Sequence, residues 1–513
     1  MRSWVPRVSE PTRQDAGLVD ARMARGAAGS AFRWNSFAVA GRQVFQMVTS
    51  IVLARVLGPD SYGVIGAATI YITLTTLLLD QGLSSALIQR PVLSRWAPGA
   101  AASLNIASGL MLAAATWVSA SWVAAFFSVP RLIPILHLLG LGLVVKSLAI
   151  APRAMQARHL TFRSIAVADV AGSAFGSGLG VTAALLGAGP TSVVFQVIGA
   201  DAVIAGVLLL SARGPVPNLR LRELRVLVPY GSRVMATNGI AYFSRNIDNI
   251  LVGRVLGVVA LSYYAMAYRV LVIPVQMIGQ TVSRVMFPVF SRQASRREAL
   301  GDSLLRAMEM LAIVTIPLMV LLAAASQEII RVVLGREWLP AASLLSVLAV
   351  AGARETVMYV SGPLIKASGR VGLLVRYELF ATTMQVGGIV IGLRYGVLGV
   401  ALGYTLAGFA LTPVLLAIQR RIAGVTARDQ LRVVWPPIHA SLWAAVAYLV
   451  VARIGLAPVV TGAVGALAYG IVALAVLRLV HREASARAWR RVKGLVRRRG
   501  AGAASGSAIS ETA

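Results

Sequence analysis

The chain has 513 residues, of which 57% are hydrophobic and only 13% are charged. Soluble domains are roughly half apolar and about a quarter charged, so this composition excludes an ordinary soluble protein and indicates a membrane protein. The net charge of +30 would suit a nucleic-acid partner, but the arginines are spread over alternate short connections instead of forming one basic face, so we expect no nucleic-acid binding.

Long apolar segments occupy most of the chain. They follow one another with short gaps, and about 20 residues of helix cross the roughly 30 Å of bilayer hydrocarbon. The sequence therefore predicts an all-α polytopic membrane protein with about 14 transmembrane helices. We expect the spans at residues 34–57, 62–87, 99–125, 132–152, 164–187, 191–211, 229–256, 262–287, 304–325, 341–363, 371–394, 397–419, 436–454 and 457–480.

The connections between these spans alternate in charge. Those after even-numbered spans carry arginine clusters, for example Arg153, Arg158 and Arg163, whereas the odd-numbered ones, such as residues 58–61, carry little charge. Because cytoplasmic connections are enriched in Lys and Arg, both termini are predicted to be cytoplasmic. Residues 1–30 are polar and lack the apolar core of a signal peptide, so we interpret them as a cytoplasmic tail.

Polar side chains recur on one face of the first predicted span. Asn35, Arg42, Gln46 and Thr49 follow at steps of seven, four and three residues, which places them along a single helical face. A charge at the bilayer centre costs about 2.5–3.5 kcal/mol, so such a face is expected to line a wet cavity. We predict Arg42 and Gln46 as substrate-binding residues. Asp80, in the second span, is a candidate for binding a coupling ion, with an interfacial position as the alternative.

An eight-residue sequence occurs twice. Ile51–Gly58 reads IVLARVLG and Ile250–Gly257 reads ILVGRVLG, and both copies end a long apolar stretch. Such a repeat predicts two similar halves, as in many secondary transporters, whose substrate path lies between the copies. We expect two pseudo-symmetric six-helix lobes around a central cavity, plus two extra C-terminal helices. The predicted domains are residues 1–30 (N-terminal tail), 31–212 (N-lobe), 213–425 (C-lobe), 426–480 (two extra helices) and 481–513 (basic cytoplasmic tail).

Three glycines in the fifth predicted span are spaced by four residues, at Gly172, Gly176 and Gly180. Small residues at this spacing are typical of a face where two membrane helices pack closely. No strand precedes them, so they do not indicate a dinucleotide site.

The seventh span, which begins the second half, has a polar face of its own. Asn238, Tyr242, Arg245 and Asn249 recur at steps of four, three and four residues, with Asp248 one turn above Arg245. We predict these four residues as part of the substrate cavity. For Asp248, a structural pair with Arg245 and a coupling-ion site are both open.

Several other charged residues lie within predicted spans. Lys146 is expected near an interface, and Asp169, close to the cytoplasmic end of the fifth span, is expected to be structural. Arg354–Glu355 and the pair Arg376 and Glu378 lie in the cytoplasmic parts of spans ten and eleven. There we expect an ion-pair network between helices.

Motifs for catalysis or metal binding are missing from the sequence. It has no cysteine, and its four histidines, His137, His159, His439 and His481, have no ligand spacing. We therefore predict no catalytic residue, no metal site and no cofactor. The basic tail from His481 to Arg499 is expected either to contact anionic membrane lipids or simply to fix the topology.

Two sets of local sequences resemble one known family. In the first half they are Leu57–Gly63 (LGPDSYG), Asp80–Leu83 (DQGL) and Ala86–Arg90 (ALIQR). In the second half they are Asn246–Asn249 (NIDN), Gly253–Gly257 (GRVLG), Tyr263–Tyr264, Tyr268–Arg269, Pro274 and Phe287–Pro288. Most of residues 30–420 is similar to the polysaccharide transporter family, of the colanic-acid and O-antigen exporter type, within the multidrug/oligosaccharidyl-lipid/polysaccharide superfamily.

The resemblance implies a flippase. Such a protein carries an undecaprenyl-pyrophosphate-linked oligosaccharide across the bacterial inner membrane for O-antigen or exopolysaccharide synthesis. Alternating access around a cationic cavity, driven by H+ or Na+, is implied, with a polysaccharide polymerase and chain-length proteins as partners. Because guanidinium binds phosphate in a bidentate way, we expect Arg42 and Arg245 to hold the anionic head group.

Other functions fit less well. A lipid II flippase of the same superfamily would share the spans and the cationic cavity. A cationic-drug exporter should instead have an acidic cavity. From another class, a polysaccharide polymerase or ligase would be expected to carry a large periplasmic loop, whereas the longest predicted outer connection, Gln327 to Pro340, is about fourteen residues.

Overall fold

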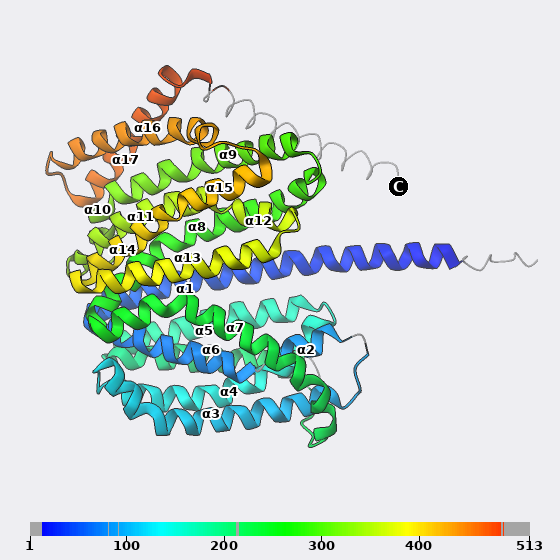
Figure 1. Ribbon diagram of the computed structural model, residues 1–513. Helices are drawn as coiled ribbons and strands as arrows, with labels where there is room; N and C mark the ends of the chain where they lie inside the picture. The colour runs from blue at the N-terminus through cyan, green and yellow to red at the C-terminus, as the bar shows by residue number, and fades with distance from the viewer. Residues whose placement is uncertain (1–12, 81, 91, 212–214, 484–485, 487–513) are drawn as a thin grey trace, which may run out of the picture. The chain divides into compact units, whose positions relative to one another are not determined.

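A computed structural model describes residues 13–80, 82–90, 92–211, 215–483 and 486 (Figure 1). All regular structure in these residues is helical, and no strand occurs among them. This confirms the all-α prediction. Most of the predicted basic tail lies outside the described residues. Helix α1 already begins at Arg13, within the predicted N-terminal tail.

The chain divides into two compact units, the first ending at Asn246 and the second beginning at Ile247. Unit 1 contains α1 (Arg13–Asp80), α2 (Leu83–Gln89), α3 (Ala97–Phe127), α4 (Leu132–Arg158), α5 (Phe162–Leu185), η1 (Gly189–Thr191), α6 (Ser192–Ser211) and most of α7 (Leu221–Val255). The division falls inside α7, so the lobe limits of 31–212 and 213–425 stay a prediction.

Unit 2 contains the end of α7 and the rest of the chain. Its elements are α8 (Val258–Gln293), α9 (Arg297–Ala324), α10 (Ser326–Val333), η2 (Arg336–Trp338), α11 (Pro340–Met358), α12 (Ser361–Ala367), α13 (Val371–Gly392), η3 (Leu393–Tyr395), α14 (Gly396–Ala410), α15 (Thr412–Ala423), α16 (Ala427–Ala452) and α17 (Pro458–Leu479). The last two helices pack on the rest of unit 2, because the hydroxyl of Tyr448 donates to Glu328 at 3.2 Å and that of Tyr469 donates to the Pro317 carbonyl at 2.9 Å.

The repeated octet ends in the same backbone conformation in both halves. Gly58 has φ 70° and ψ 174° and interrupts α1 between the first two predicted spans. Gly257 has φ 86° and ψ 171° and separates α7 from α8. Because a positive φ with extended ψ is open essentially to glycine alone, the repeat preserves the turn that joins the first two helices of each half.

Eleven helical segments of the described residues are long and apolar enough to cross a membrane. Two of them, Gly41–Gln89 and Val371–Ala423, have 49 and 53 residues, more than twice the ~20 needed for one crossing, and each covers two predicted spans. The helix α7 is not among the eleven, in keeping with the polar face predicted for it. The protein is thus a multi-span membrane protein, and the count of fourteen stays a prediction.

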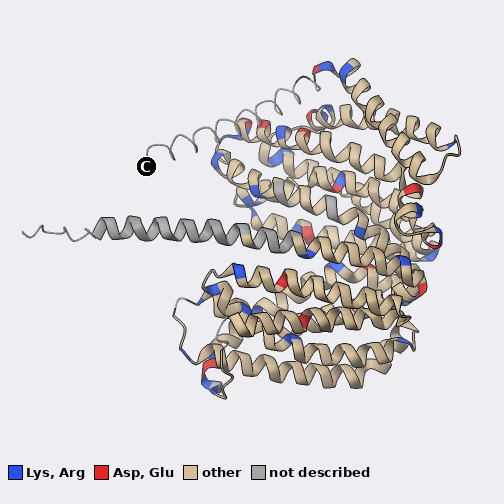
Figure 2. Cartoon of the chain, turned by 180° about the vertical axis from the view of Figure 1, so that it is seen from behind, with Lys and Arg blue, Asp and Glu red and all other residues tan. Residues whose placement is uncertain are grey.

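The charged residues lie mostly toward helix ends, and long middle stretches of the helices carry few of them (Figure 2). This distribution is what the bilayer imposes on spanning helices. The few charges inside helices therefore need local partners or a polar cavity.

The glycine face of α5 packs against α6, as predicted. A Cβ on Gly176 would lie 2.4 Å from the Gln196 carbonyl oxygen, and one on Gly172 would lie 2.9 Å from that of Ala200. Gly180 would meet the Cβ of Gln196 at 2.7 Å. These contacts leave no room for a side chain, so the glycines set the distance between the two helices.

Replacing Gly176 with Ala is expected to lower the thermal unfolding midpoint of the purified protein. The added methyl group would overlap backbone atoms of α6, and overpacking of this kind costs about 1–3 kcal/mol. Gly178→Ala on the same helix is the matched control, because nothing lies within 4 Å of a Cβ there. Equal midpoints for the two variants would contradict the packing argument.

Candidate functional site

Unit 1 contains a polar cavity of about 490 Å³. Residues of α1, α2, α4, α5 and α6 line it, and three predicted site residues, Arg42, Gln46 and Asp80, are among them. Arg42 and Gln46 of the predicted polar face therefore line a cavity, whereas Thr49 is buried and is not among the lining residues. The side chain of Asn35 lies outside the described part of the chain. The further polar residues of the cavity include Thr76, Ser84, Ser173, Ser177 and Gln196.

Two ion pairs neutralise most of the charge in this cavity. Lys146 Nζ of α4 lies 3.7 Å from Asp201 Oδ2 of α6. Arg153 of α4 binds both carboxylate oxygens of Asp169 on α5, one of them at 3.2 Å. Lys146 is thus held by a partner in the cavity, and its expected position near a membrane interface stays a prediction. Asp169 is bound by Arg153, in keeping with the structural role expected for it. The pairs fix α4 against α5 and α6.

Arg42 is the cation of this cavity that has no carboxylate partner among the described ion pairs. Its Nε is buried and has no hydrogen-bond partner there. Asp80 is not in an ion pair either, and its Oδ1 accepts bonds from the Ser84 hydroxyl at 2.5 Å and the Ser84 amide at 3.3 Å. A guanidinium has five N–H donors in a planar fork, so Arg42 can bind an anionic group that enters the cavity.

The residues predicted on α7 do not line this cavity. Asn238 and Arg245 have exposed side chains. Tyr242 is buried, and its hydroxyl donates to the Ile70 carbonyl at 2.5 Å, which gives it a packing contact with α1. The roles of these three residues in binding substrate therefore stay predictions.

Asp248 is buried in unit 2, with 7% of its surface exposed. Its Oδ1 accepts bonds from the amide and the side chain of Asn249 at 2.8 and 3.1 Å, and its Oδ2 accepts from the Tyr264 hydroxyl at 3.1 Å. None of these donors carries a charge, and Arg245 is not its partner in any described ion pair. An ionised buried carboxylate is costly when no cation compensates it, and the role of Asp248 in binding a coupling ion stays a prediction.

A row of tyrosines leads from Asp248 to a second carboxylate. The ring of Tyr264 stacks on Tyr268 at 6.2 Å between centroids, and Tyr268 meets Tyr404 edge-on at 6.5 Å. Tyr404 donates its hydroxyl to Glu355 Oε2 at 3.4 Å. No described ion pair includes Arg354, Glu355, Arg376 or Glu378, although Arg354 and Glu355 attract each other at longer range, so the predicted network between helices stays a prediction.

Sequence reasoning missed Asp201 and Tyr264. Asp201 is a charged residue in the middle of the apolar helix α6. A charge within an apolar span is also the feature that selected Asp80, so Asp201 could have been identified from the sequence. Tyr264 was quoted only as part of the family resemblance, and its contact with Asp248 is what gives it a place in the site.

Comparison with known proteins relates the sequence to proteins of polysaccharide biosynthesis. Residues 52–343 match the family described as Polysaccharide biosynthesis protein. The chain is 25% identical over 347 residues to Teichuronic acid biosynthesis protein TuaB of Bacillus subtilis (strain 168), covering 67% of this chain and 72% of that protein. It is 24% identical over 428 residues to Lipopolysaccharide biosynthesis protein WzxC of Escherichia coli (strain K12), covering 80% and 85%. Succinoglycan biosynthesis transport protein ExoT of Rhizobium meliloti (strain 1021) is 23% identical over 360 residues, covering 70% and 73%.

Solved structures share the fold. Lipid II flippase MurJ in an inward closed conformation has a TM-score of 0.70 at 15% identity, covering 88% of this chain and 99% of that chain. An inward-facing multidrug resistance MATE family transporter of the MOP superfamily has a TM-score of 0.56 at 17% identity, covering 75% and 95%. The fold is therefore that of this transporter superfamily.

Proposed function

The chain belongs to the Polysaccharide biosynthesis protein family, whose match at residues 52–343 covers more than half of it, and from this we propose that it flips a lipid-linked oligosaccharide across the bacterial inner membrane. The cargo is an undecaprenyl-pyrophosphate-linked repeat unit of a surface polysaccharide. Relatives named for lipopolysaccharide and succinoglycan biosynthesis, the latter a transport protein, support this assignment. The protein acts as a transporter and not as an enzyme.

The observation that carries the proposal is Arg42. Lys146 and Arg153 are already bound to carboxylates, so Arg42 is the cation of the unit 1 cavity whose guanidinium is available for an anionic group. The pyrophosphate of the cargo is such a group, and arginine binds phosphate oxygens in a bidentate way. Gln46 lies on the same face and supplies a neutral hydrogen-bonding group beside it. Arg245, on α7, is proposed as the second contact to the head group.

Coupling to an ion gradient is assigned to Asp248. The buried carboxylate is held by Asn249 and Tyr264 and is in no ion pair among the described residues, so uptake of H+ or Na+ neutralises it. Asp80 is a second candidate, because it lines the unit 1 cavity and has Ser84 as its described partner. Both termini are proposed to be cytoplasmic, and a polymerase and chain-length proteins are proposed as functional partners.

A lipid II flippase is the second candidate, because the fold is shared with MurJ. The two functions differ in the cargo: lipid II carries a peptide, whereas a polysaccharide precursor carries only sugars. The sequence relatives favour the polysaccharide precursor.

The function can be tested in proteoliposomes containing the purified full-length protein. We expect it to move undecaprenyl-pyrophosphoryl sugars between leaflets faster than protein-free vesicles do, and to move lipid II more slowly. Preference for lipid II would transfer the assignment to the second candidate. Absence of movement of either lipid, together with failure to restore surface polymer in cells lacking their own flippase, would reject both.

A further inference from the structure

Unit 2 contains a cavity of its own, of about 400 Å³. The helices α11, α12, α13 and α14 supply most of its lining. Three tyrosines, Tyr359, Tyr377 and Tyr404, line it together with charged and amide side chains. The unit 1 cavity, of similar size, has no aromatic residue among its lining residues. The two cavities therefore suit ligands of different chemistry.

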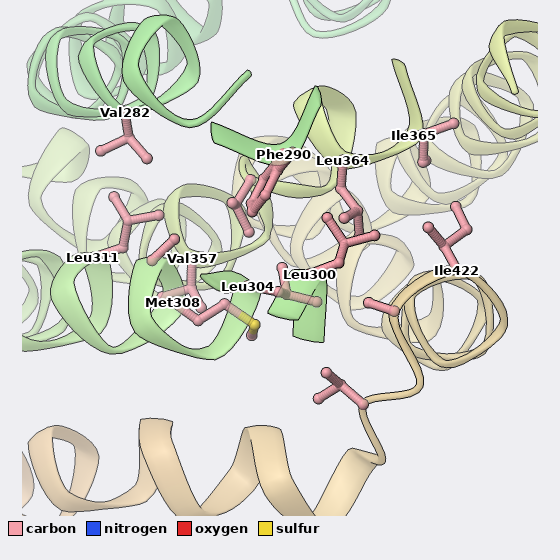
Figure 3. Close-up of a cluster of buried hydrophobic side chains, with 14 of the residues drawn as sticks. Val282, Phe290, Leu300, Leu304, Met308, Leu311, Val357, Leu364, Ile365 and Ile422 are labelled. Atoms are coloured by element: carbon pink, nitrogen blue, oxygen red, sulfur yellow. The ribbon is translucent and has the colours of Figure 1, made fainter. Parts of the chain in front are cut away.

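The polar face of this cavity is held in place by an apolar face on the same helices. Val357 of α11 and Leu364 of α12 are almost completely buried. They belong to one cluster with Leu300 and Leu304 of α9, as Figure 3 shows. Because tightly packed side chains fix the rotation of a helix, the remaining face of α11 and α12 is directed to the cavity before any ligand binds.

The cavity contains both signs of charge, which attract each other but form no close ion pair among the described residues. Arg354 and Lys366 are its cations and Glu355 and Glu378 its carboxylates, and none of the four is in a described ion pair. Arg354 Nε donates instead to the Thr412 hydroxyl at 2.9 Å, and Glu355 receives the Tyr404 hydroxyl.

This charge pattern selects among ligands. Two cations and two carboxylates leave the cavity without net charge, so it favours neither an anion nor a cation. A neutral molecule rich in hydroxyl groups satisfies both kinds of group, because each hydroxyl donates to a carboxylate and accepts from a cation. Tyrosine rings add flat apolar surface with a polar edge, which fits the C–H face of a pyranose ring. A cavity of this size lies in the usual range of about 300–1,000 Å³ for small-molecule sites.

We propose that the unit 2 cavity binds a hexopyranose residue of the transported oligosaccharide. Tyr377 lies against the sugar ring, Glu378 and Gln385 bind its hydroxyls, and the pyrophosphate is bound elsewhere, by Arg42. This inference rests on the proposed function and adds a site that recognises the glycan to one that recognises the head group.

Binding of four lipids to the full-length protein in nanodiscs tests the proposal. The probes are bare undecaprenyl pyrophosphate and the same lipid carrying glucose, galactose or N-acetylglucosamine. At least one sugar-bearing lipid should bind about tenfold more tightly than the bare lipid, as expected for two or three added hydrogen bonds. Tyr377→Ala and Gln385→Ala should each remove most of that gain and leave the affinity for the bare lipid unchanged. Tyr395→Ala, at an exposed tyrosine that does not line the cavity, is the matched control and should retain the gain.

The outcomes separate the two proposals. If all four lipids bind the wild-type protein equally, the sugar site is rejected and the proposed function stands. If none of the four binds, the proposed function fails as well. If the sugar-dependent gain in affinity persists in both cavity variants, the glycan binds elsewhere and the proposed sugar site is wrong.

A labelling experiment gives a second measurement that does not depend on a large-to-small substitution. The chain contains no cysteine, so a single introduced one can be labelled selectively. Thr382 lines the cavity and its neighbour Thr383 does not. The sugar-bearing lipid should slow maleimide labelling of the T382C variant severalfold and leave that of T383C unchanged, and bare undecaprenyl pyrophosphate should slow neither. Equal slowing of both variants, or of neither, would contradict the site.

Discussion

Replacing Arg42 with Ala is expected to reduce transport of the lipid-linked oligosaccharide by about 10- to 100-fold. A hydrogen bond to a charged group contributes about 1.5–3 kcal/mol, and Arg42 is the unpaired guanidinium of the unit 1 cavity. Arg42→Lys should recover part of the rate, because it restores the charge but not the planar fork. The rate of flipping in proteoliposomes and the amount of surface polymer in a flippase-null strain are the measurements.

The control for the Arg42→Ala variant is Arg131→Ala, which removes an arginine charge from an exposed site. Arg131 pairs with Asp60, and their side chains are 72% and 64% exposed, so its loss should affect neither stability nor transport much. Arg245→Ala tests the second proposed contact separately. Normal polymer output from Arg42→Ala combined with Arg245→Ala would reject the assignment of the head-group site.

Replacing Asp248 with Asn is expected to abolish the dependence of transport on an ion gradient. The amide keeps the shape of the side chain, but it takes up no proton and attracts no cation. A membrane potential of 100 mV is worth about 2.3 kcal/mol per charge, so coupling to one charge drives an asymmetry of up to roughly 50-fold between leaflets. The wild-type protein should build up such an asymmetry in energised proteoliposomes, and the variant should equilibrate the lipid without accumulating it.

Two further variants complete that experiment. Tyr264→Phe removes the hydroxyl that donates to Asp248 and should weaken coupling without eliminating it. Asp60→Asn changes an exposed carboxylate outside the cavities and should behave as wild type. Full accumulation by Asp248→Asn would show that the coupling group lies elsewhere, with Asp80 as the next residue to test.

Local patterns in the sequence predicted much of the architecture. The spacing of Gly172, Gly176 and Gly180 predicted a packing face, and α5 does press that face against α6. The octet repeat predicted equivalent positions in the two halves, and Gly58 and Gly257 share one backbone conformation. The period of an α-helix and the thickness of a bilayer are fixed, so these features can be read from residues close together in the chain.

The partners of the charged residues were not accessible in this way. Lys146 and Asp201 are 55 positions apart, and they meet only because α4 and α6 lie side by side at a particular height. The partners within the network expected around Arg354, Glu355, Arg376 and Glu378 could not be named from the sequence for the same reason, and no described ion pair includes these residues. Contact between helices depends on their relative rotation and axial position, which packing sets.

The sequence alone determined that this is a helical membrane protein, related it to polysaccharide transporters and placed Arg42 on a polar face. Only the tertiary structure decided that Arg42 lacks a carboxylate partner, that Lys146 and Arg153 have one, and that tyrosines and charges of both signs surround a second cavity. Hydropathy and periodicity act along one helix, whereas the neutralisation of a buried charge depends on which side chains of other helices come within a few ångströms of it.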